Sequence, residues 1–115
     1  MSLGSTQREF TRYVSDLIDF IYASGYECTL GDAYRDPRSH GAMGKKGSYG
    51  RPSSAHKQRL AIDLNLFKDG IYLRSTKAHE PFGQFWKMCH PDNRWGGDFP
   101  KKDGNHYSRK YAGIA

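Results

Sequence analysis

The sequence predicts a single α+β domain, residues 1–115, in which a small antiparallel sheet is flanked by helices. Two segments have apolar residues at helical spacing, and one long strand alternates strictly between apolar and polar residues. The predicted order is helix, strand, loop, strand, strand, helix and a final strand. The first five residues are expected to be a tag or disordered.

The first helix is predicted over residues 6–25. Thr6 and Glu9 have the spacing of a capping box at its start. Apolar residues then follow on one stripe: Phe10, Val14, Leu17, Ile18 and Ile21. Charged residues occupy the opposite face: Arg8, Arg12, Asp16 and Asp19. We therefore expect this helix to support the core and to carry no site.

A strand is predicted over residues 26–35, with a bulge at Gly31 and Asp32. Residues 36–54 are rich in glycine, proline and basic residues and have no apolar period, which predicts a long loop. Loops of this length in a small domain are usually functional or mobile.

The clearest strand follows, over residues 60–66, because leucine and isoleucine alternate there with Ala61, Asp63 and Asn65. Residues 68–70 predict a turn, and residues 71–75 predict its hairpin partner. A second helix is predicted over residues 78–89, with Pro81 in its first turn and Trp86 in the core. The rest of the chain is expected to form turns and short extended pieces.

The chain is basic, with a formal net charge of +6, so we expect an anionic partner rather than a cationic one. Nucleic acid, bacterial wall polymers and membrane surfaces all satisfy this condition. No segment has the length of a membrane span, and the chain does not begin with a signal-peptide pattern. We expect Cys28 and Cys89 to be buried thiols, rather than a disulfide or a metal site with His90.

Asp63 is the first candidate functional residue, because a carboxylate in the middle of a half-buried strand needs a partner. A salt bridge to an arginine is the usual explanation for an isolated aspartate. His56, seven residues earlier, favours a second explanation, since imidazole and carboxylate together suit zinc. A third ligand would complete such a site.

Four other histidines are candidates for that ligand: His40, His79, His90 and His106. His40 lies in the long loop, while solvation or charge at a helix end explains His79 and His90. His106 follows Asp103 by three residues, and a zinc hydrolase needs a carboxylate beside the metal to take a proton from water. The set His56, Asp63, Asp103 and His106 therefore contains the parts of a hydrolytic zinc site.

These residues resemble a known family of zinc peptidases. The segments that carry the resemblance are SAH (54–56), AID (61–63), WGGDF (95–99) and DGNH (103–106). They are similar to the D-Ala-D-Ala carboxypeptidases and L-Ala-D-Glu endopeptidases of peptidoglycan, which have the Hedgehog/DD-peptidase fold. Single-domain phage endolysins are the most similar members, and the resemblance extends over residues 26–107.

The resemblance implies a role for each matching residue. His56, Asp63 and His106 would bind Zn2+, Asp103 would be the general base, and Arg35 would stabilise the oxyanion. Ser54 would contact the substrate. Tyr49, Trp95 and Asp98 are candidate rim contacts, with loop packing as the alternative, and Asn65 is a candidate to orient Asp63.

Two residues depart from the family pattern. Arg59 stands where the motif usually has glycine, so either the backbone is ordinary there or the side chain projects into the cleft. Asp103 stands where many members have glutamate, which favours the endolysin-like branch.

The resulting hypothesis is a monomeric zinc peptidase that cuts peptidoglycan stem peptides, with L-Ala–D-Glu as the expected bond. It would be made in the host cytoplasm, released through a holin pore and active on the cell wall, without stable membrane association. The alternatives are a D-Ala-D-Ala carboxypeptidase, a zinc domain that binds without cutting, and a basic nucleic-acid-binding module. We expect no nucleic-acid partner, because the basic residues are dispersed and no recognised motif is present.

Overall fold

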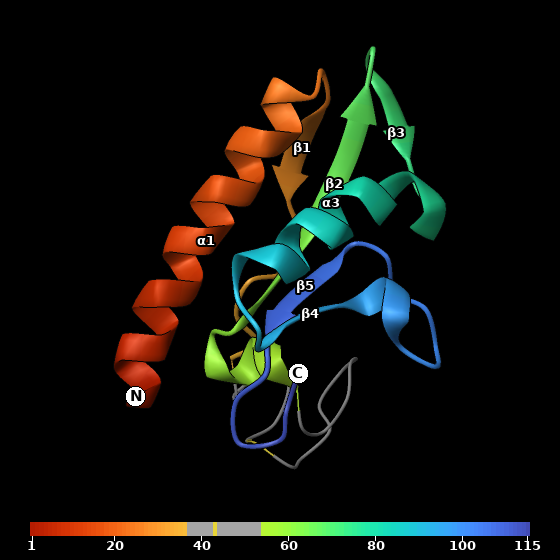
Figure 1. Ribbon diagram of the computed structural model, residues 1–115. Helices are drawn as coiled ribbons and strands as arrows, with labels where there is room; N and C mark the ends of the chain where they lie inside the picture. The colour runs from red at the N-terminus through yellow and green to blue at the C-terminus, as the bar shows by residue number, and fades with distance from the viewer. Residues whose placement is uncertain (37–42, 44–53) are drawn as a thin grey trace.

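The computed structural model describes residues 1–36, 43 and 54–115 and has the predicted α+β architecture, with five antiparallel strands (Figure 1). The described elements, in chain order, are α1 (Leu3–Ala23), β1 (Glu27–Leu30), the 3₁₀ helix η1 (Ala55–Gln58), β2 (Ala61–Lys68), β3 (Ile71–Leu73), α3 (Thr76–Cys89), β4 (Asn93–Trp95), the 3₁₀ helix η2 (Gly96–Asp98) and β5 (His106–Arg109). Within these described ranges, no helix is long and apolar enough to cross a membrane.

The sheet is built around β2. Its strand order is β1-β2-β5-β4, and β3 pairs with the C-terminal part of β2. In Figure 1, α1 runs beside β1 and α3 crosses in front of β2. The side chains of Ile62, Leu64 and Leu66 pack with both helices in one core, so the helices cover the same face of the sheet. The alternation predicted for residues 60–66 is confirmed, and Asp63 lies on the opposite face.

Helix α1 begins earlier than the sequence suggested. The side chain of Ser2 caps it by accepting a hydrogen bond from the Ser5 backbone N–H at 3.1 Å. Thr6 is therefore inside the helix, where its hydroxyl donates to the Ser2 carbonyl at 2.7 Å. The capping-box interpretation of Thr6 is wrong, and residues 3–5 are helical rather than disordered.

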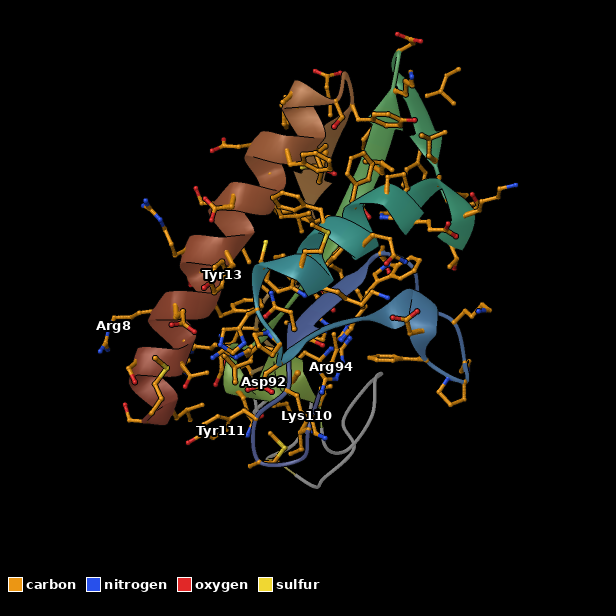
Figure 2. All side chains as sticks on the ribbon, viewed as in Figure 1. Arg8, Tyr13, Asp92, Arg94, Lys110 and Tyr111 are labelled. Atoms are coloured by element: carbon orange, nitrogen blue, oxygen red, sulfur yellow. The ribbon has the colours of Figure 1, made fainter. Side chains whose placement is uncertain are left out.

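The solvent face of α1 is largely as predicted. Figure 2 shows Arg8 pointing away from the rest of the molecule, whereas Tyr13 lies against the C-terminal end of α3, its ring 6.0 Å from that of His90. Glu9 is tied to the sheet by an ion pair with Arg109 at 2.7 Å. This contact joins the first helix to the last strand.

The predicted strand over residues 26–35 is shorter, ending at Leu30. Beyond it, the Gly31 N–H donates to the Asp63 carbonyl at 2.7 Å, and the Asp63 N–H donates to the Asp32 carbonyl at 2.8 Å. Two residues thus face one, which is the hydrogen-bond pattern of the predicted bulge. This bulge holds the backbone of Asp63 from one side.

Helix α3 also starts before its predicted position. Ser75 caps it by accepting from the Ala78 N–H at 3.1 Å, so the helix begins at Thr76 and Pro81 lies inside it rather than in the first turn. Proline removes the N–H that would reach the carbonyl of Lys77. Lys77 is exposed to solvent, which lowers the cost of that missing bond.

Trp86 lies in the core, as predicted, with no exposed surface. Its ring meets Phe10 of α1 edge to face at 5.5 Å, and its indole N–H reaches the Ser108 carbonyl at 2.9 Å. Cys28 and Cys89 are both free and half-buried, so the disulfide alternative is wrong. Burial raises the pKa of both thiols, and the charge of Asp16 adds to the effect at Cys89.

Candidate metal centre

The first residue of the site, His56, is held by the short helix η1. The hydroxyl of Ser54 caps this helix by accepting from the His56 N–H at 3.2 Å. Just after this helix, the Leu60 N–H donates to the Ala55 carbonyl at 3.0 Å. This hydrogen bond directs the chain into β2. The imidazole of His56 is only 1% exposed.

The other two residues are brought together by strand pairing. In the antiparallel pair of β2 and β5, Asp63 lies directly opposite His106, so both side chains project from the same face of the sheet. Oδ1 of Asp63 lies 3.2 Å from Nε2 of His56 and 3.5 Å from Nδ1 of His106. The three potential ligand atoms all lie within 4.8 Å of one another.

The electrostatics of this cluster suit a cation. Burial by itself raises the pKa of Asp63, but the polar contacts with His106 and His56 and the charges of both rings outweigh it and lower the pKa to about 2. Asp63 is therefore ionised at neutral pH. Within the described part of the chain, no well-oriented hydrogen bond satisfies either Nε2 of His56 or Oδ1 of Asp63. Buried polar atoms are rarely left unsatisfied, and two imidazoles with one carboxylate are a typical zinc-binding set.

The cluster opens onto a cleft of about 510 Å3. Its described lining comes from the segment after β1, from η1 and its cap, and from the segment between η2 and the start of β5: Arg35, Ser54, His56, Phe99, Pro100, Lys101, Lys102, Asp103 and His106. Three of these residues are basic and one is acidic. A substrate could therefore reach His56 and His106 from solvent.

Asp103 lies on the wall of this cleft, and its side chain is exposed. Its backbone is fixed on both sides, because its N–H donates to the Gly96 carbonyl at 2.9 Å and its carbonyl accepts from the His106 N–H at 3.1 Å. A Cβ atom on Gly96 would lie 2.0 Å from the Asp103 carbonyl oxygen. Only glycine permits this approach, which joins the carboxylate and the potential ligand His106 in one rigid turn.

Arg35 also lines the cleft. Its guanidinium Nη1 donates to Oγ of Ser54 at 3.1 Å, and its Nε lies 3.6 Å from a carboxylate oxygen of Asp32. Its backbone N–H donates to the His56 carbonyl at 3.3 Å. Arg35 is thus bonded to the same short segment that holds His56.

Comparison with protein families supports the assignment that this geometry suggests. The profile described as D-alanyl-D-alanine carboxypeptidase matches residues 48–109, more than half of the chain. The chain belongs to this family. The matched range contains His56, Asp63, Asp103 and His106, whereas Arg35 lies before it. Comparison with curated proteins finds no significant match.

Trp95 is not among the described residues that line the cleft. In the β4–β5 pair it lies opposite Tyr107, on the core face of the sheet, and it is 4% exposed. Its ring fits against Gly83 and Gly97, where added Cβ atoms would come within 2.2 and 2.3 Å of it. The packing alternative for Trp95 is therefore the one that the structure supports.

Two further candidates are occupied elsewhere. Asp98 is not among the described residues that line the cleft, and it forms an ion pair with Lys87 at 2.7 Å. The amide of Asn65 donates to Thr29 at 3.2 Å and its Oδ1 lies 3.5 Å from the hydroxyl of Tyr72, so its described contacts are with the neighbouring strands rather than with Asp63. Tyr49 and His40 lie outside the described residues.

Sequence reasoning did not single out four residues that line the cleft: Phe99, Pro100, Lys101 and Lys102. Phe99, which the WGGDF segment contains, places its ring 5.3 Å from that of His106. Lys101 and Lys102 line the cleft beside Asp103, and Nζ of Lys102 donates to the Gly97 carbonyl at 3.2 Å. The sequence did contain a signal for the two lysines, because they lie between the WGGDF and DGNH segments.

His79 differs from the expectation of a solvated helix end. It is 2% exposed, and its Nδ1 lies 2.7 Å from the hydroxyl of Tyr107. His90 does lie at the end of α3, where its Nε2 is 3.6 Å from Glu9. Among the described residues, His56, Asp63 and His106 form the one group with metal-binding geometry, so no metal site involves Cys28, Cys89 and His90.

Proposed function

We propose that this protein is a zinc peptidase that hydrolyses peptide bonds in peptidoglycan stem peptides, and that it acts as a phage or prophage endolysin on the L-Ala–D-Glu bond. One observation carries the proposal. In a chain of the carboxypeptidase family, a buried His-Asp-His cluster with unsatisfied ligand atoms lies in a cleft beside an exposed carboxylate, Asp103.

His56, Asp63 and His106 would hold the ion. A bound Zn2+ would supply Lewis-acid polarisation and acidify a coordinated water. Asp103 accepts a proton from the attacking water and later delivers it to the leaving amine. Its exposed position on the cleft wall allows it to serve both steps.

Arg35 donates hydrogen bonds to the substrate carbonyl oxygen as negative charge develops on it. Its contacts with Ser54 and Asp32 fix the guanidinium before the reaction, so little reorganisation accompanies the transition state. Ser54 is buried and caps η1, so it acts on the substrate chiefly by holding Arg35 and His56 in place.

The charge of the cleft supports an anionic peptide as substrate. Arg35, Lys101 and Lys102 outnumber Asp103 in the described lining. Stem peptides carry free carboxylates along their length, and a cleft of one sign concentrates ligands of the other. A module that only binds nucleic acid would not require the His-Asp-His cluster.

The second candidate is a D-Ala-D-Ala carboxypeptidase, which the description of the matching family favours. Mass analysis of purified peptidoglycan after digestion distinguishes the two activities. Endopeptidase action would leave L-Ala on the glycan and release the remaining stem peptide. Carboxypeptidase action would remove only the terminal D-Ala.

A metal assay completes the test. Protein prepared without chelators should contain about one zinc ion per chain. Absence of zinc together with absence of any peptidoglycan fragment would overturn the proposal. An endolysin should in addition lyse permeabilised cells when added from outside.

A further inference from the structure

Arg59, the residue that departs from the family pattern, has a left-handed backbone. Its φ and ψ are 58° and 35°, and it closes η1 by directing its N–H toward the carbonyls of Ala55 and His56. This conformation is the usual end of a helix whose chain must turn sharply, and glycine is preferred there because it has no Cβ atom. The first of the two explanations offered for Arg59, an ordinary backbone, is therefore wrong.

The second explanation, projection into the cleft, is not supported either. Arg59 is not among the described residues of the cleft lining. Instead its guanidinium carbon lies 4.1 Å from the centre of the Tyr34 ring, which is cation–π geometry. An arginine at this position has an unfavourable backbone conformation and gains a contact that glycine cannot make.

Tyr34 immediately precedes Arg35, and this is why the contact matters. The Arg35 N–H and the Arg59 N–H donate to the same carbonyl, that of His56, each at 3.3 Å. No described strand contains Tyr34 or Arg35, since β1 ends at Leu30. The Arg35 N–H therefore binds the same carbonyl that ends η1, and the Arg59–Tyr34 stack adds a side-chain contact between the two segments.

We propose that the Arg59–Tyr34 stack is a clamp that positions Arg35 against the His56 segment, and that Arg59 is a positioning residue for the reaction. The claim that Arg59 affects catalysis rests on the proposed function of Arg35 as the oxyanion donor. The claim that the stack positions Arg35 is independent of that function. The chain thus has a stabilising side-chain contact where the family pattern has a flexible glycine.

The test compares Arg59→Gly and Tyr34→Leu, which both remove the clamp, with two controls in the zinc-loaded protein. Tyr34→Phe keeps the ring. Asp69→Gly relieves the same left-handed strain, at φ 51° in the β2–β3 turn, far along the strand from the cleft. Amide hydrogen exchange at Arg35 is measured by NMR, together with kcat and KM on stem peptides.

We expect Arg59→Gly and Tyr34→Leu to raise the exchange rate of the Arg35 amide about tenfold and to lower kcat about tenfold, with KM changed less than about twofold. The double variant should be no worse than either single one, because both remove one contact. Thermal midpoints should stay near that of the parent for Arg59→Gly and Asp69→Gly. Tyr34→Phe and Asp69→Gly should leave exchange and kcat unchanged.

Unchanged exchange at Arg35 in both clamp variants would overturn the inference. Raised exchange with unchanged kcat would overturn the catalytic part, as would a further loss of kcat when Arg59→Gly is added to Arg35→Ala. If the parent protein proves to have no peptidase activity, the proposed function fails, and the exchange rates alone decide whether the clamp exists.

Discussion

On β5, His106 projects toward the cleft and Tyr107 projects into the core, where its hydroxyl lies 2.7 Å from Nδ1 of His79. The two faces of one strand therefore each hold a buried histidine with a polar partner. On the core face, burial lowers the pKa of His79 to about 4 and raises the pKa of Tyr107, so both groups are neutral.

On the cleft face the buried histidines have a charged partner instead of a neutral one. Asp63 is held ionised between His56 and His106, and ligand atoms there lack hydrogen bonds among the described residues. Burial is similar on both faces, since His79 is 2% exposed and His106 is 4% exposed. Burial alone therefore does not identify a ligand histidine. A ligand histidine is identified by polar atoms without hydrogen-bond partners at an open cleft.

The largest effect should come from Asp63→Ala, which removes the charged partner of both rings. We expect loss of bound zinc and a fall in peptidase activity of about 10³-fold or more, because the remaining two imidazoles cannot hold the ion tightly. Zinc content and the rate of stem-peptide cleavage measure this. His79→Asn, on the core face, should keep both. If Asp63→Ala retained stoichiometric zinc, the cleft face of β5 would not be the metal-binding face.

Asp103→Asn should have the next largest effect. The amide cannot accept a proton, so kcat should fall by roughly 10²–10⁴-fold while zinc content stays unchanged. Asp98→Asn is the matched control, since Asp98 is also an exposed carboxylate but pairs with Lys87 outside the described cleft lining. Its kcat should change less than about twofold. Equal activities of the two variants would show that Asp103 is not the base.

Much of the fold could be predicted because its signals are local. The alternation along β2 and the apolar stripes of α1 and α3 each lie within one element. The helix starts were predicted wrongly because a single serine, Ser2 or Ser75, provides the cap, whereas Thr6 and Glu9 offered a more obvious pattern. One hydroxyl among several is a weak signal without coordinates.

The cluster of potential ligands was predicted from residue types and from a family resemblance, and its geometry could not be. The position of His106 opposite Asp63 depends on the register of two strands far apart in sequence. The same register places Trp95 on the core face, and a shift by one residue would have reversed it. The left-handed backbone of Arg59 is likewise a property of the turn and not of the residue.

A third prediction sharpens the core side of the comparison. Because the pKa of His79 is about 4 in the fold and about 6.5 in an unfolded chain, only the unfolded chain takes up this proton between those values. The contribution of neutral His79 is complete above about pH 6.5 and is lost as the pH falls toward 4, at a cost of up to about 3 kcal/mol. Urea unfolding from pH 7 to pH 4.5 measures it.

His79→Asn should abolish that part of the pH dependence, because asparagine can still accept a hydrogen bond from Tyr107 and does not titrate. The difference between the two proteins isolates His79, since the other histidines are unchanged. Parallel stability curves for the parent and the variant would show that the fold does not lower the pKa of His79, which would contradict the contrast drawn between the two faces of β5.

The smallest effect should come from the rim of the cleft. Lys101→Glu reverses one of its three described positive charges, so KM for anionic stem peptides should rise about three- to tenfold with kcat changed less than twofold. Lys77→Glu, exposed on α3 and absent from the described lining, makes the same change in net charge and is the control. The difference between them should shrink as salt is added, because screening weakens an exposed charge at this range. Equal KM values at low salt would mean that net charge, and not the cleft face of the sheet, attracts the substrate.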